Sequence, residues 1–102
     1  MARVRVPIAS TVTDDAGSTY ICFAEGHPRA DGALDVKLAF ALKDESRFHR
    51  TPGVECLQQS EEALAEWAMS LSRDQLAAAL LRALANRRDV EATLRTKRRR
   101  SS

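Results

Sequence analysis

The alternation of residues 34–43 limits the fold more than any other feature of this chain. Every second residue is large and apolar, and the residues between them are charged or small. Side chains of a β-strand point alternately to opposite faces, so this pattern predicts a strand with one buried face. On a helix the same apolar residues would spread around every side. The apolar set is Leu34, Val36, Leu38, Phe40 and Leu42.

Two further strands are predicted before this one. Residues 3–8 alternate arginine with apolar residues, which indicates a half-buried strand, and Pro7 places it at an edge or a bulge because proline cannot donate to a ladder. Residues 19–24 are apolar on both faces, which favours a central strand. Clusters of Gly, Pro and Asp predict a turn at 14–18 and a loop at 25–33.

Residues 44–53 are polar and are expected to be irregular, and from residue 54 the apolar period changes to 3.6. Ser60 is expected to cap a first helix, and Ser72 with Gln75 forms a capping-box pattern that starts a second. The apolar phase predicts a single second helix over residues 73–97. The expected buried stripes are Leu57, Leu64, Trp67, Ala68 and Leu71, then Leu76, Ala79, Leu80, Ala83, Leu84, Val90 and Leu94.

These elements predict an α+β domain, a three-stranded antiparallel meander packed on one face by two C-terminal helices in the order βββαα. Residues 1–45 would form the sheet half, residues 54–95 the helical half, and residues 96–102 a basic tail. A chain of 102 residues, 44% of them hydrophobic, fits one globular domain. No run reaches the roughly 20 apolar residues of a membrane span, and no signal peptide is evident. We therefore expect a cytoplasmic protein, of bacterial or phage type.

Signs of catalysis are missing from the sequence. It has no glycine-rich phosphate loop and no nucleophile motif, so we expect neither an enzyme nor a small-molecule substrate. Two cysteines do not make a disulfide scaffold. Four residues are of types that ligate zinc, but their spacing does not match the close ligand pairs of structural zinc sites. No metal or cofactor is therefore expected. These residues are Cys22, His27, His49 and Cys56.

Charge segregates strongly along the chain. Residues 87–102 hold seven basic and two acidic residues, a net +5; since the whole chain is +2, residues 1–86 sum to −3. A basic end of this kind suits an acidic protein or nucleic acid, although it is also typical of a solvated tail that binds nothing. The candidate residues are Arg95, Lys97, Arg98, Arg99 and Arg100, with Arg3, Arg5 and Lys37 of the sheet as a second basic patch.

Arg87 interrupts the apolar stripe of the second helix, and Val90 and Leu94 continue the stripe beyond the reach of a small sheet. Either the stem of Arg87 covers apolar surface, or this stretch faces a partner. The first hypothesis is therefore a non-enzymatic protein-binding module, an inhibitor or adaptor of phage or mobile-element type, whose partner is another protein or a second copy. The alternative is a small nucleic-acid-binding protein. Base stacking has little support, because Phe40 is expected in the core and leaves only Tyr20 and Phe23 on strands.

Overall fold

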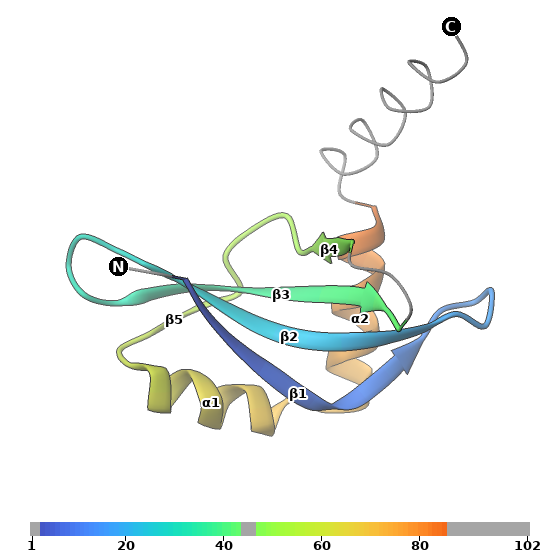
Figure 1. Ribbon diagram of the computed structural model, residues 1–102, viewed down its shortest axis with the longest axis horizontal. Helices are drawn as coiled ribbons and strands as arrows, with labels where there is room; N and C mark the ends of the chain where they lie inside the picture. Colours follow the sequence, from blue (N-terminus) through green and yellow to red (C-terminus); the bar gives the residue numbers. More distant parts are fainter. Residues whose placement is uncertain (1–2, 44–46, 86–102) are drawn as a thin grey trace, which may run out of the picture.

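The computed structural model describes residues 3–43 and 47–85 of the chain, which form an antiparallel sheet followed by two helices (Figure 1). The fold is therefore α+β, as the sequence predicts. The strands run in the order β1-β2-β3-β4, and β5 also pairs with β3. The elements are β1 (Val4–Thr13), β2 (Thr19–Pro28), β3 (Leu34–Leu42), β4 (Phe48–Arg50), β5 (Cys56–Gln58), α1 (Glu61–Ser70) and α2 (Arg73–Leu84).

The predicted meander is present, with β1, β2 and β3 paired in sequence. The turn between β1 and β2 depends on Asp14, whose carboxylate accepts hydrogen bonds from the backbone N–H groups of Ala16 and Ser18 and from the hydroxyl of Tyr20. Gly17 adopts φ +87° there, a conformation that glycine reaches without strain. The register shifts between Ile8 and Thr11, so the bulge lies just after the proline of β1.

The predicted loop at 25–33 is partly wrong, because β2 continues through residue 28 and pairs with β3 as far as Leu34. Gly26 and Pro28 suggested a break in structure. Gly26 instead lies where a helix approaches the sheet, and an added Cβ would come 3.0 Å from Cδ2 of Leu64. The glycine therefore permits close packing and does not mark a turn.

In the described part of the chain the sheet has five strands instead of the three predicted. β4 and β5 both pair with β3, in segments that were expected to be irregular or helical. Strands of three residues are too short for an alternating pattern to be visible, and the long β3 provides the template on which they pair. Leu57 is consequently not part of a helical stripe. It lies in β5 opposite Asp35 and is 50% exposed.

Both helices begin where the sequence predicts. The Ser60 hydroxyl accepts a hydrogen bond from the N–H of Ala63, and the capping box of Ser72 and Gln75 is complete. The helices pack on one face of the sheet, and Trp67 lies partly buried against their core. The fully buried large side chains of that core are Phe40, Val36, Leu64, Leu76 and Leu80.

The second helix is described from Arg73 to Leu84, with Ala85 as its C-cap. Its predicted continuation to residue 97 lies outside the described residues, as does the basic tail at 96–102. In the part of the chain that the structure describes, neither helix has the length and apolar character needed to cross a membrane.

Leu64 and Leu57 provide a matched test of this core. Leu64→Ala should lower the free energy of unfolding by about 2–5 kcal/mol, because truncation of a fully buried leucine leaves a cavity. Leu57→Ala should lower it by less than about 1 kcal/mol, since this side chain is half exposed. Urea unfolding of both variants measures the difference. Equal losses would indicate that Leu57 packs in the core.

Candidate functional site

The candidate site is the face of the sheet opposite the helices, which we call the outer face. Alternation along the strands places there the residues that do not point into the core. The strand registers bring residues from four strands together. They are Arg5 of β1, Phe23 and Glu25 of β2, Lys37, Ala39 and Ala41 of β3, and Phe48 and Arg50 of β4.

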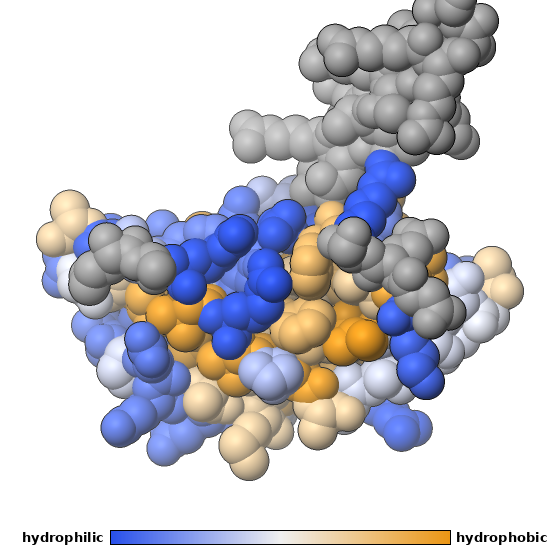
Figure 2. All heavy atoms as spheres, viewed as in Figure 1, coloured by the Kyte–Doolittle hydropathy of each residue, from blue (hydrophilic) through white to orange (hydrophobic). Residues whose placement is uncertain are grey.

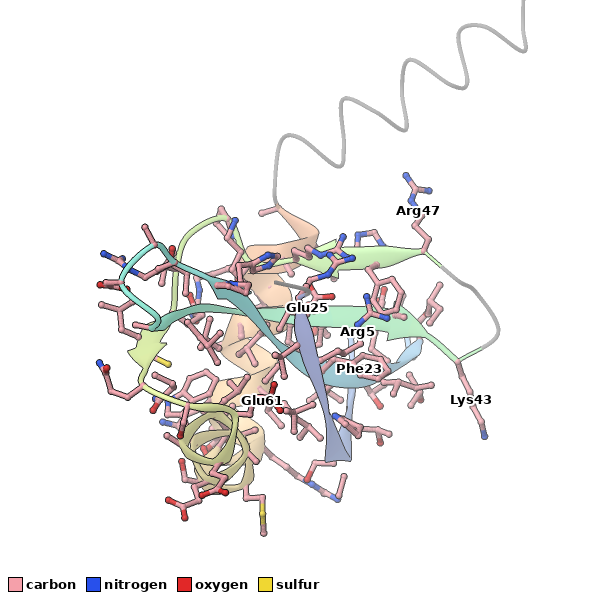
Figure 3. The ribbon with its side chains drawn as sticks, turned by 60° about the vertical axis from the view of Figure 1, so that its left-hand side comes forward. Arg5, Phe23, Glu25, Lys43, Arg47 and Glu61 are labelled. Atoms are coloured by element: carbon pink, nitrogen blue, oxygen red, sulfur yellow. The ribbon has the colours of Figure 1, made fainter. Side chains whose placement is uncertain are left out.

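A fully buried carboxylate lies at the centre of the outer face. Nε and Nη2 of Arg5 both donate to Oε2 of Glu25, at 3.1 and 2.9 Å. From the other side, Nε of Arg50 donates to Oε1 at 2.6 Å and its Nη2 donates to Oε2 at 3.3 Å. Nη1 of Arg3 lies 3.8 Å from Oε2. These four residues form what we call the Arg–Glu cluster, and Figure 3 shows Arg5 and Glu25 side by side.

The arginines keep Glu25 ionised. Burial by itself would raise the pKa of this carboxyl, but hydrogen bonds from Arg50 and Arg5 and the nearby charge of Arg3 hold the pKa below its ordinary value. Three guanidinium groups therefore surround one carboxylate, and the Arg–Glu cluster has two net positive charges at neutral pH.

Two phenylalanines complete the outer face. The guanidinium carbon of Arg5 lies 4.4 Å from the ring centroid of Phe48 and 5.7 Å from that of Phe23. The two rings meet edge to face, with centroids 5.6 Å apart. Ala39 and Ala41 are buried on this face although the helices pack on the other one. The rings and guanidinium groups therefore cover this part of the sheet themselves.

Two basic residues at one end of the sheet lie apart from the acidic residues of α1. Lys43 and Arg47 lie at the end of β3 and just before β4, whereas Glu61 lies on α1, away from them (Figure 3). Exposed carboxylates of α1 include those of Glu61, Glu62 and Glu66. Figure 2 shows hydrophilic and apolar side chains lying next to one another across the middle of the visible surface.

Of the residues proposed from sequence, Arg3, Arg5 and Lys37 lie on the outer face. Arg3 and Arg5 are already paired with Glu25, so the patch is less basic than the sequence suggests. The other proposed contact residues lie outside the described residues; they are Arg87, Val90, Leu94, Arg95, Lys97, Arg98, Arg99 and Arg100.

Sequence reasoning missed Glu25, Phe48 and Arg50, because all three fall in segments that were expected to be loops. The only available signal was the identity of Glu25, an acidic residue directly after an apolar strand. Nothing local to Phe48 or Arg50 indicated a strand, because their pairing with β3 is a long-range contact.

No metal or thiol chemistry stands out in the described residues. Among residues 3–43 and 47–85, no group of three His, Cys, Asp or Glu side chains could hold a metal ion. Burial raises the pKa of the Cys22 thiol to about 11, so it stays protonated and unreactive at neutral pH.

Comparison with known proteins does not identify a family. No family model matches the chain, and neither a curated protein nor a solved structure matches it significantly. The outer face is therefore the main guide to function.

Glu25→Gln should lower the free energy of unfolding by about 3 kcal/mol. The amide has the shape of the carboxylate but cannot neutralise Arg5 and Arg50, and loss of one partner of a buried ion pair is strongly destabilising. The control is Asp35→Asn, which removes an exposed ion pair with Arg29 and should change stability by at most about 1 kcal/mol. Urea unfolding at pH 7 compares them. Small, equal effects would contradict a central role for Glu25.

The same carboxylate makes stability depend on pH. Because the folded-state pKa of Glu25 lies below its ordinary value of 4.5, its contribution is complete above about pH 4.5 and is lost as the pH falls through the folded-state pKa. The stability difference between the wild type and Glu25→Gln should therefore shrink in acid. Unfolding free energies measured at a series of pH values from about 7 to 3 test this; a constant difference would show that the carboxylate is not held ionised.

Proposed function

We propose that this chain is a small non-enzymatic protein-binding module, an inhibitor or adaptor that covers an acidic surface of its partner with the outer face of its sheet. The observation that supports this most directly is the Arg–Glu cluster with its two phenylalanines, on the face opposite the helices. A cytoplasmic location in a bacterial or phage setting is part of the proposal.

The charge of the outer face favours an acidic partner. The cluster retains two positive charges after pairing with Glu25. Lys37 lies beside Glu25 in register and makes no ion pair within the described residues. Complementary charge of this kind accelerates association and excludes basic partners.

The residue types also favour a protein partner. Arginine and aromatic residues are enriched at the centres of protein interfaces, where they supply a large contact area. Here Arg5 and Arg50 are held in place by Glu25, and Phe48 lies under Arg5. A nucleic acid would find fewer stacking contacts on this face, because Arg5 already covers the Phe48 ring on which a base would stack.

Nucleic-acid binding is the second candidate, for one specific reason. The helix α2 packs against β4, and the seven basic residues of positions 87–102 follow α2 in sequence. The chain therefore leaves the described part close to Arg50, so its basic end and the outer face could contact one polyanion. In the first candidate, Arg87, Val90 and Leu94 would instead add a second contact with the protein partner.

Capture from a bacterial lysate by the full-length wild type and two charge-reversed variants tests the proposal. Lys37→Glu reverses one charge on the outer face, and Arg73→Glu makes the same change at the start of α2. The proposal is supported if the wild type and Arg73→Glu both capture an acidic protein whose capture resists nuclease. With Lys37→Glu, the amount captured should fall at least about tenfold.

Loss with both variants, or with neither, would argue against docking on the outer face. Capture that disappears after nuclease treatment and weakens by orders of magnitude between about 50 and 200 mM salt would favour the nucleic-acid candidate. Thermal unfolding of both variants verifies that each is folded.

A further inference from the structure

Within the described residues, Arg5 uses only one edge of its guanidinium group. Its Nε and Nη2 form the side-on edge, and both donate to Oε2 of Glu25. Nη1 donates to no acceptor among residues 3–43 and 47–85, and the side chain is 37% exposed. The end-on edge, formed by Nη1 and the second hydrogen of Nη2, therefore has no acceptor within the described residues. This edge matches the two oxygens of a carboxylate.

We propose that the end-on edge of Arg5 is a carboxylate-binding site that takes an Asp or Glu side chain of the partner. The inference depends on the proposed function and names the chemistry by which the outer face would recognise its partner. Glu25 and the partner carboxylate would then occupy two adjacent edges of one guanidinium group.

The site is organised before any ligand arrives. Two hydrogen bonds to a fully buried carboxylate fix the plane of the guanidinium group, and the Phe48 ring supports it at 4.4 Å. An unrestrained arginine loses conformational entropy when it binds, whereas this one is already ordered in the folded protein. Glu25 is thus a positioning residue, since it acts on the ligand through Arg5.

The charge balance permits a second carboxylate near the first. Three guanidinium groups surround Glu25, so one partner carboxylate still leaves the Arg–Glu cluster with a net positive charge. No ion would be buried without a counter-charge.

The test measures binding of a blocked, fluorescent poly-glutamate peptide of about ten residues to the full-length protein, with a glutamine peptide of equal length as the control ligand. Arg5→Lys keeps the charge but removes the planar end-on edge, so the dissociation constant should rise roughly tenfold. Lys43→Gln removes a whole charge at the end of β3 and should raise it no more than about threefold. The glutamine peptide should not bind measurably.

Equal affinity of the wild type and Arg5→Lys for the glutamate peptide would overturn the inference. So would a failure of the wild type to bind that peptide, or a larger loss with Lys43→Gln than with Arg5→Lys. Tighter binding of a thymidine oligonucleotide of similar length, lost in Arg5→Lys, would also overturn it and identify a phosphate site.

Direct observation of the wild-type side chain keeps the inference testable if Arg5→Lys does not fold. Guanidinium resonances of Arg5 should shift in ¹H–¹⁵N spectra as the glutamate peptide is added, and unchanged resonances would overturn the site. Failure here would leave the proposed function separately testable, because a protein partner could dock on Lys37 and the phenylalanines without using this edge of Arg5.

Discussion

The buried carboxylate of Glu25 is the constraint on which the outer face depends. A carboxylate with no exposed surface must be paired. Its partners here come from β1 and β4, the strands that flank the β2–β3 pair. Arg5 lies 20 residues before Glu25 in sequence and Arg50 lies 25 residues after it. One ion cluster therefore links β1, β2 and β4, and the short β4 is held by that cluster as well as by its ladder with β3.

The two faces of the sheet are stabilised in different ways. Beneath the helices, Phe40, Leu64 and Leu76 form a closely packed apolar core, in which even Gly26 is needed for the approach of α1. On the outer face, guanidinium groups and phenylalanine rings cover the alanines of β3. The core buries its side chains, whereas the outer face holds the guanidinium group of Arg5 in order, with no acceptor for its Nη1 among the described residues. An ordered donor of this kind is suited to binding, which is why the proposed function rests on this face.

Prediction from sequence succeeded where a pattern was local and long. The ten residues from Leu34 show a complete alternation, and the serine caps at Ser60 and Ser72 interact within their own first turns. It failed where a residue's role depends on a distant partner. Gly26 was interpreted as a break, although it fits against Leu64, and the position of Leu57 was decided by pairing with β3.

The sequence by itself determined the α+β class, the meander and the helix starts, because periodicity and capping act over a few residues. It also placed Arg3, Arg5 and Lys37 on one face of the sheet. Only the tertiary structure decided that Glu25, Phe48 and Arg50 meet there. Their contacts require β1, β2, β3 and β4 to be paired in one register. Such long-range pairing leaves no local pattern in the sequence. The arginines that the sequence suggested were a free basic patch are therefore paired with Glu25 in an ordered ion cluster.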